Sequence, residues 1–166
     1  MNGCGTDYRN SMVVLNDFTT SVRKAFDEID PNWESYRGLV VCGTHSPHDV
    51  DDMIEAIRKA REDGTPTLLI CAGHQMGAIE YARNVLGIKD ATSEEFGTGT
   101  FVVKKRPELK VGLHDGESWW SNYDVAIDWE IPKHFISVGY HPEYGSSISR
   151  PHPILVKFIS NCKKYV

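Results

Sequence analysis

One cysteine in the sequence stands where a nucleophile would be presented to a substrate. Cys71 ends an apolar run, residues 67–70, and the small residues Ala72 and Gly73 follow it, so the chain can turn directly from a strand into a helix. Such a nucleophile elbow lifts the side chain above the sheet. The helix N-terminus favours the thiolate, and the Ala72 amide could donate to an oxyanion. The competing interpretation is core packing, because free cysteines are among the most buried residues.

The acid–base partners that such a thiol needs occur together at another predicted strand end. His141-Pro142-Glu143 follows the β-rich run 135–139, and the proline holds the carboxylate two positions from the imidazole. A carboxylate there can fix the tautomer and orientation of a histidine that takes the thiol proton. With seven histidines in the chain, the spacing alone is a weak signal. Residue types and positions together predict a triad of Cys71, His141 and Glu143.

The elements that would position these side chains follow an α/β pattern. Short β-rich runs alternate with helical periods, which is typical of a mainly parallel sheet. The expected parallel strands are residues 12–15, 39–42, 67–71 and 135–139, and the expected antiparallel strands are 100–103 and 109–113. In open α/β sheets ligands bind at the carboxyl ends of the strands, and Cys71 and His141 both fall at such ends.

Four helices are expected between these strands, from apolar residues that recur at helical spacing. The predicted markers are the face Val22, Ala25, Phe26 and Ile29 in the first helix, a start at Ser46-Pro47 in the second, inward Val85 and Leu86 with a Gly87 cap in the third, and a start at Pro153 in the fourth. The alternation of these helices with the strands predicts helices on the faces of the sheet.

The composition is that of an ordinary globular domain, with 40% hydrophobic and 25% charged residues among 166. We expect a single domain over residues 1–166, with residues 1–11 as a flexible extension. A net charge of −5 with scattered basic residues argues against nucleic-acid and membrane binding. No apolar run reaches the ~20 residues of a membrane span, and no signal peptide is recognisable. Four widely spaced cysteines predict reduced thiols and a cytoplasmic location.

The segment that begins at Cys71 carries a longer and more specific pattern. Cys71-Ala-Gly-His-Gln75 and the run Ile79–Phe96 closely resemble the glutaminase domain of the CTP synthases, which is a class I glutamine amidotransferase. Tyr140-His-Pro-Glu-Tyr144 is similar to the family's histidine–glutamate motif, and residues 39–44 lie where the family has its oxyanion strand. The motifs occur in family order and cover most of residues 12–162. The resemblance implies a three-layer, flavodoxin-like α/β fold with helices on both faces and a nucleophile elbow.

The resemblance also implies a reaction. Cys71 would attack the side-chain amide carbon of glutamine, giving a glutamyl thioester and ammonia, and water would then release glutamate. His141 would shuttle protons while Glu143 orients its ring. No cofactor and no metal ion are expected to take part.

The resemblance further implies which groups hold the substrate. The expected oxyanion donors and glutamine-binding residues are the amides of Gly43 or Thr44 and of Ala72, and the side chains of Gln75 and Glu95. Glu95 suits the α-ammonium group of the substrate. The family's arginine for the substrate carboxylate has no counterpart, because no arginine lies between Arg106 and Arg150. Asn122, Lys133 or another group would have to replace it.

Two positions near the nucleophile depart from the family pattern. The family usually has glycine two residues before the nucleophile, where this chain has Leu69, and Thr44 replaces the second glycine of the oxyanion strand. We expect Leu69 to crowd the elbow and Thr44 to change the peptide geometry. Both changes bear on the rate of hydrolysis.

The synthetase part of the CTP synthases has no counterpart in the sequence, and no G-x-x-x-x-G-K-[ST] phosphate-binding motif replaces it. We therefore expect that this chain cannot make CTP alone. It would pass ammonia to a separate ATP-dependent synthetase, act as a plain glutamine hydrolase, or act on another amide as a related cysteine hydrolase. A catalytically impaired binding or regulatory module is a further alternative, for which Leu69 and the missing arginine are the evidence. A homo-oligomer is compatible with each of these.

Three further groups of residues allow more than one interpretation. Cys42-x-x-His45-x-x-His48, with His74, invites a zinc site, but structural sites usually have tighter spacing, and His45 and His48 are expected to rim the active-site mouth instead. The pair Trp119-Trp120 could stack on a base or sugar, or simply cover the sheet. The run Lys104-Lys105-Arg106 is expected to be a solvated turn, or a docking point for an acidic partner.

Overall fold

Four parallel strands form the central sheet of the protein. The computed structural model describes residues 11–44, 46–105 and 123–164 of the chain. The strands are β1 (Met12–Leu15), β2 (Gly38–Val41), β3 (Thr67–Ile70) and β7 (Phe135–Val138). They lie side by side in the order β1-β2-β3-β7, every neighbouring pair being parallel. The four strands predicted from the sequence are confirmed, each to within one residue at either end.

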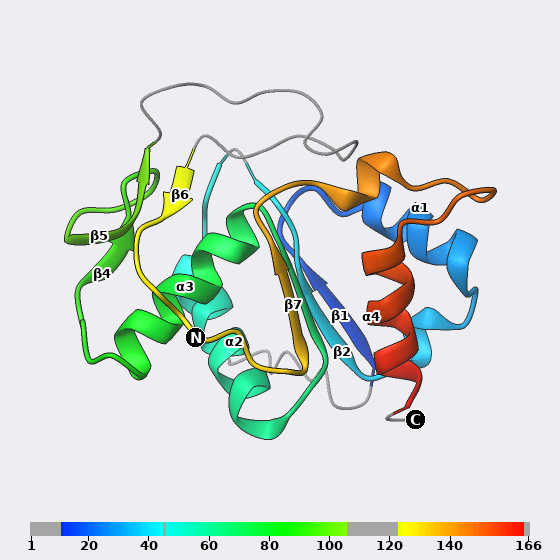
Figure 1. Cartoon of the computed structure of the whole chain (residues 1–166), viewed down its shortest axis with the longest axis horizontal. Helices are drawn as coiled ribbons and strands as arrows, with labels where there is room; N and C mark the ends of the chain where they lie inside the picture. Colours follow the sequence, from blue (N-terminus) through cyan, green and yellow to red (C-terminus); the bar gives the residue numbers. More distant parts are fainter. Residues whose placement is uncertain (1–10, 45, 106–122, 165–166) are drawn as a thin grey trace.

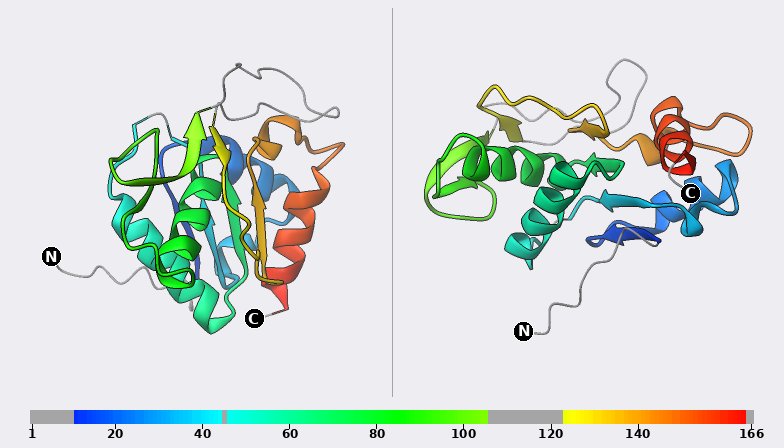
Figure 2. Two further views of the ribbon diagram at one scale, coloured as in Figure 1. Left: turned by 60° about the vertical axis from the view of Figure 1, so that its left-hand side comes forward. Right: turned by 90° about the horizontal axis from the view of Figure 1, so that it is seen from below.

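Helices cover both faces of this sheet, so the molecule has three layers (Figures 1 and 2). The helices are α1 (Thr20–Ile29), α2 (Val50–Asp63), α3 (Ala72–Asn84) and α4 (Pro153–Lys163), and two short 3₁₀ turns are η1 (Trp33–Ser35) and η2 (Pro142–Gly145). Alternate strand residues face opposite helices: Leu39 and Leu69 pack with α2 and α3, whereas Val40 and Leu68 pack with α1 and α4. Both strand faces are therefore buried, as in other parallel sheets, and the predicted three-layer fold is confirmed.

A second, smaller sheet lies beside α3 (Figure 1). It contains β4 (Ala91–Ser93), β5 (Thr100–Lys105) and β6 (Tyr123–Val125), with β4 parallel and β6 antiparallel to β5. The predicted strand at 100–103 is confirmed and extends to Lys105. The predicted strand at 109–113 lies outside the described residues. The strands β4 and β6 were not predicted, because three residues are too few to show a two-residue period.

The predicted start of the second helix at Ser46-Pro47 is wrong. Helix α2 begins at Val50, after Asp49 in the left-handed conformation with φ of 51°. The Ser46 N–H donates to Thr44 Oγ1 at 3.0 Å. This local hydrogen bond turns the chain at Ser46, so the serine does not cap the helix.

The predicted end of the third helix is also partly wrong. Helix α3 ends at Asn84, and Val85 and Leu86 are each 47% exposed instead of facing inward. Gly87 adopts a left-handed φ of 77°, and the Ile88 N–H donates back to Ala82 O at 2.9 Å. The glycine therefore ends the helix as predicted, although the chain leaves the helical path two residues before it.

Helix α4 is the last element of the described chain. Helix α4 begins at Pro153, as predicted, and His152 caps it by accepting a hydrogen bond from the Ile154 N–H. Nearly all of the predicted flexible extension, residues 1–11, lies outside the described residues. None of the helices within the described ranges combines the length and the apolar character that crossing a membrane requires.

Candidate active site

Cys71 occupies a strained turn between β3 and α3. Its backbone has φ of 53° and ψ of −107°, a conformation that residues other than glycine rarely adopt. The Cys71 N–H is fixed by Val138 O at 2.9 Å. A Cβ at Gly73 would lie 2.1 Å from Val41 O, so glycine is needed where α3 presses against β2. The predicted elbow is present, and the Cys71 side chain is only partly buried.

His141 joins Cys71 to Glu143 at the carboxyl edge of the sheet. Its Nδ1 lies 2.6 Å from Glu143 Oε1, and its ring and the Cys71 side chain both adjoin Gly43, so the two lie next to each other. His141 and Glu143 are both buried. Burial alone would lower the pKa of His141, but hydrogen bonds and charges from Cys71 and Glu143 outweigh it and raise the pKa to about 9. The three predicted triad residues therefore come together, and Tyr144 stacks on the imidazole with ring centres 4.8 Å apart.

The two peptide groups after β2 are oriented by the loop between β1 and α1. The Cys42 carbonyl accepts from Asn16 Nδ2 at 2.9 Å, and the Gly43 carbonyl accepts from the Phe18 N–H at 3.2 Å. In a trans peptide the N–H points opposite to the C=O, so the N–H groups of Gly43 and Thr44 face away from this loop. Because β2 lies between β1 and β3, they face the side of the sheet that carries the elbow.

Of the three expected oxyanion residues, Gly43 lies beside the Cys71 side chain and Ala72 follows it directly in the chain. A Cβ at Gly43 would lie 2.8 Å from His141 Cε1 and 3.5 Å from Cys71 Cβ, so the chain just after β2 directly adjoins the triad. Thr44 is buried, and its hydroxyl donates to the Asp17 carboxylate rather than entering the site. Ala72 is the first residue of α3, where backbone N–H groups have no partner within the helix.

Gln75 and Glu95 are linked by hydrogen bonds one helical turn beyond the thiol. Gln75 Nε2 donates to Glu95 Oε2 at 2.8 Å, and Ser93 Oγ donates to Gln75 Oε1 at 2.8 Å. The Glu95 N–H in turn donates to Ser93 Oγ at 3.1 Å. The two expected substrate-binding residues therefore lie together, with Ser93 bridging them.

The expectation that Leu69 crowds the elbow is wrong. Its side chain lies beneath α3 at Gly77, where an added Cβ would be only 2.5 Å from Leu69 Cδ1. Trp129 closes the other side of this contact, 3.0 Å from the same position. The leucine is accommodated because the facing helix residue has no side chain.

Lys133 is also wrong as a candidate for the substrate carboxylate. It precedes β7 and, with Pro66, His134, Asn161 and Lys164, lines a cavity of about 250 Å³. Pro66 precedes β3, so this cavity lies at the amino ends of the strands, opposite the edge that carries Cys71. The other candidate, Asn122, lies outside the described residues.

Acidification is expected to destabilise the protein through His74. Burial lowers the pKa of this ring, whose Nδ1 lies 2.5 Å from Ser137 Oγ, from its ordinary 6.5 to about 4. The unfolded chain takes up a proton below pH 6.5, whereas the folded chain resists it. The free energy of unfolding should therefore fall as the pH drops from 6.5 towards 4. Urea unfolding at pH 7 and pH 5 should show a smaller decline for His74→Gln than for the wild type. The exposed His48→Gln control should show a decline at least as large as the wild type, because the Ser46 carbonyl and Asp17 raise the pKa of His48 rather than lower it.

The alternative zinc pattern can be followed only at its described members, among which Cys42 and His48 differ in exposure. Cys42 is fully buried, whereas His48 is exposed, bonds Ser46 O at 2.9 Å and lies 3.9 Å from an Asp17 oxygen. No group of three or more potential ligands occurs within the described residues. His45, Trp119-Trp120 and Arg106 lie outside them. Lys104 and Lys105 are exposed but belong to strand β5, so the expected turn at these two residues is wrong, and their role in docking remains a prediction.

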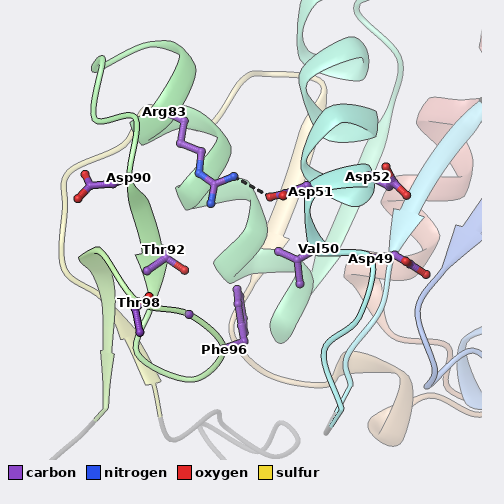
Figure 3. Close-up of a pocket in the computed structure, with 10 residues that line it drawn as sticks. Asp49, Val50, Asp51, Asp52, Arg83, Asp90, Thr92, Phe96 and Thr98 are labelled. Atoms are coloured by element: carbon purple, nitrogen blue, oxygen red, sulfur yellow. Dashed lines mark hydrogen bonds and ion pairs between the residues drawn. The ribbon is translucent and has the colours of Figure 1, made fainter. Parts of the chain in front are cut away.

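A separate cavity of about 540 Å³ opens between the start of α2, the end of α3 and β4 (Figure 3). Four aspartates line it, and its Arg83 is paired with Asp51 at 2.9 Å. No member of the triad lies among its lining residues, so it is distinct from the candidate active site.

Residues 16–18 and Ser93 were missed by sequence reasoning. Residues 16–18 directly follow β1, so the rule that ligand sites form at strand carboxyl ends could have drawn attention to them. Ser93 lies within the run Ile79–Phe96 but carries no distinguishing chemistry of its own. Its position between Gln75 and Glu95 is visible only in the folded chain.

Comparisons with known proteins agree with this geometry. A family model described as glutamine amidotransferase class-I matches residues 9–128. The CTP synthase of Methanoregula boonei is 44% identical over 182 residues, covering 78% of this chain and 35% of that enzyme. The CTP synthase of Methanoculleus marisnigri is 31% identical over 179 residues, covering 76% and 34%. The chain thus spans about a third of the length of these relatives.

A solved structure shows the same fold. The Trypanosoma brucei CTPS glutaminase domain with bound acivicin superposes with a TM-score of 0.71, covering 92% of this chain and 93% of that one. Its sequence identity is 19%, so this likeness bears on the fold alone.

Proposed function

The chain belongs to the class-I glutamine amidotransferase family, and on that basis we propose that it hydrolyses the side-chain amide of glutamine to glutamate and ammonia. The observation that carries the proposal is the arrangement of Cys71, His141 and Glu143. A thiol on a strained elbow lies beside a buried imidazole, which is bonded at 2.6 Å to a buried carboxylate. This is the arrangement that activates a cysteine for attack on an amide.

The first half-reaction forms a thioester. The Cys71 sulfur attacks the side-chain carbonyl carbon of glutamine, a C–S bond forms, and the carbonyl electron pair moves onto oxygen. When this tetrahedral intermediate collapses, the C–N bond breaks and His141 gives its proton to the leaving nitrogen, which departs as ammonia. The raised pKa of His141, about 9, supports this role because the ring holds a proton at neutral pH.

The second half-reaction uses water. His141 takes a proton from the water that attacks the thioester, the C–S bond breaks, and glutamate leaves. In both half-reactions the negative oxygen would be held by the Ala72 amide and by the amides of Gly43 or Thr44 on the side of the elbow. Glu143 keeps the ring in the tautomer that directs Nε2 to the sulfur.

Substrate binding is proposed for the linked side chains of Gln75 and Glu95. Glu95 supplies the negative charge that an α-ammonium group requires, and Gln75 holds it through the 2.8 Å hydrogen bond. Ser93 fixes the amide orientation of Gln75 by donating to its oxygen. A substrate that lacks the α-ammonium group should therefore bind poorly.

The destination of the ammonia is proposed from what the chain matches. It covers about a third of each CTP synthase and matches the class-I glutamine amidotransferase model. We propose that this region acts as a glutaminase domain that supplies ammonia to an ATP-dependent synthetase domain or subunit in the cytoplasm.

The proposal is tested by measuring glutamate and ammonia released from glutamine by the purified chain. We expect both products in equal amounts, little release from asparagine, and little from glutaramate, which lacks the ammonium group that Glu95 would bind. Cell extract added to supply a partner controls for an activity that needs one. Absence of release under both conditions would overturn the glutaminase proposal and favour a binding module. Release from glutaramate equal to that from glutamine would contradict the role of Glu95.

A further inference from the structure

Three consecutive residues after β1 fasten the oxyanion segment, which we define as residues 42–44. Asn16 Nδ2 donates to Cys42 O, the Phe18 N–H donates to Gly43 O, and the Asp17 carboxylate accepts from the Thr44 hydroxyl. The Cys42 N–H also donates to Leu15 O at 3.1 Å, which continues the ladder between β1 and β2. Beyond this last ladder bond, the orientation of the segment depends on the loop rather than on the sheet.

The Asn16 side chain holds the first peptide group of this segment by a hydrogen bond. The peptide joins Cys42 to Gly43, with its carbonyl on Asn16 Nδ2 at 2.9 Å and its N–H on the opposite side, towards the elbow. Gly43 has no side chain to restrict rotation of the peptide. Without the Asn16 amide, the Gly43 N–H loses the bond that aims it.

Two features of Asn16 reduce the stability of the folded chain. Its φ is 81°, in the left-handed region, and its Oδ1 is buried with no hydrogen-bond partner among the described residues. A strained backbone and an unsatisfied buried oxygen each reduce stability, and such features cluster at functional sites. A glycine would suit the backbone better but could not donate to Cys42.

We propose that Asn16 is a positioning residue for the oxyanion site, which sets the direction of the Gly43 N–H by holding the Cys42 carbonyl. The inference rests on the proposed function, since it assigns Asn16 a part in stabilising the same tetrahedral intermediate. Asn16 does not touch the substrate and acts only through the peptide group. Its loss should lower kcat for glutamine and leave KM nearly unchanged, because the oxyanion forms only in the reaction.

The test compares two reactions of the Cys71 thiol. Acylation by p-nitrophenyl acetate passes through a tetrahedral oxyanion: the C–S bond forms, the carbonyl electrons move to oxygen, and p-nitrophenolate leaves. Alkylation by iodoacetamide displaces iodide directly and forms no oxyanion. The ratio of the two rates therefore reports the oxyanion site independently of thiol reactivity and of glutamine recognition.

Two variants change Asn16, and a third variant at another position serves as a control. Asn16→Gly fits the left-handed backbone and removes the donor, and Asn16→Asp keeps the shape but turns an acceptor towards the Cys42 carbonyl. Each should lower the acylation-to-alkylation ratio about tenfold or more, a fraction of the effect of removing an oxyanion donor outright. Asn32→Gly, in an exposed turn before η1, should leave the ratio unchanged. Thermal melts show which variants are folded, and one folded Asn16 variant is enough to test the proposal.

The possible outcomes separate this inference from the proposed function. An unchanged ratio in a folded Asn16 variant, or equal falls in both rates, would overturn the positioning role. A wild type that releases no glutamate, but whose Asn16 variants still lose acylation selectively, would support the positioning role and sink the glutaminase assignment.

Discussion

Replacing Cys71 by alanine or by glycine is expected to abolish glutamate release, by about 10⁴-fold or more, because no other group can form the thioester. The two variants should differ in stability. Cys71 has φ of 53° and ψ of −107°, a conformation that strains any residue with a Cβ and that glycine adopts freely. Cys71→Gly should therefore be more stable than Cys71→Ala by about 1 kcal/mol, the lower end of the cost of such strain.

Urea unfolding of the two variants measures this difference, and the glutamate assay measures the loss of activity. Labelling with iodoacetamide followed by peptide mass analysis supplies the control. The wild type should be labelled at Cys71, whereas Cys42 and Cys162 should resist because burial raises the pKa of both thiols. Residual activity in Cys71→Ala within tenfold of the wild type would exclude Cys71 as the nucleophile. Equal stability of the two variants would show that the elbow is not strained.

Replacing Glu143 by glutamine is expected to lower kcat by about 10²- to 10⁴-fold, the range seen when the orienting carboxylate of a triad is neutralised. The change should also move the pH dependence. Glu143 and Cys71 raise the pKa of His141 to about 9 against the effect of burial. The ring of His141 then stays protonated at neutral pH and loses its proton as the pH rises through about 9. Without the carboxylate the pKa of His141 falls, so the alkaline limb should shift to lower pH.

The measurement is kcat/KM for glutamine between pH 6 and pH 10, for the wild type and Glu143→Gln. Glu34→Gln is the matched control, because Glu34 is an exposed carboxylate in η1, away from the triad. The control should keep both the rate and the alkaline limb. An alkaline limb at the same pH in Glu143→Gln would show that the limb does not report His141, and a rate close to the wild type would remove Glu143 from the triad.

The sequence alone determined most of the central sheet and the position of the elbow. Apolar runs as short as residues 67–70, bounded by turn residues, are typical of interior strands, and their lengths set the predicted bounds. The small residues after Cys71 indicated the elbow. Only glycine fits at position 73, because a Cβ there would lie 2.1 Å from Val41 O. The triad could be predicted because its members follow the ends of predicted strands, and parallel strands bring their carboxyl ends to one edge of the sheet.

Local patterns were insufficient where a polar contact or a short strand decided the structure. The start of α2 depends on the hydrogen bond from the Ser46 N–H to Thr44 Oγ1, which overrode a capping pattern. The end of α3 came two residues early although the apolar period continued. The strands β4 and β6 have three residues each, too few to carry a periodic signal.

Only the tertiary structure decided the contacts that surround the triad. Asn16 and Cys42 are 26 residues apart, and Gln75 and Glu95 are 20 apart, so no sequence spacing could pair them. Leu69 fits because the facing position on α3 is Gly77, and Lys133 is excluded because it lies before β7 rather than after it. The physical reason is the same in each case. Backbone patterns fix which residues enter a strand or helix, whereas side-chain partners depend on how separate elements are registered against one another.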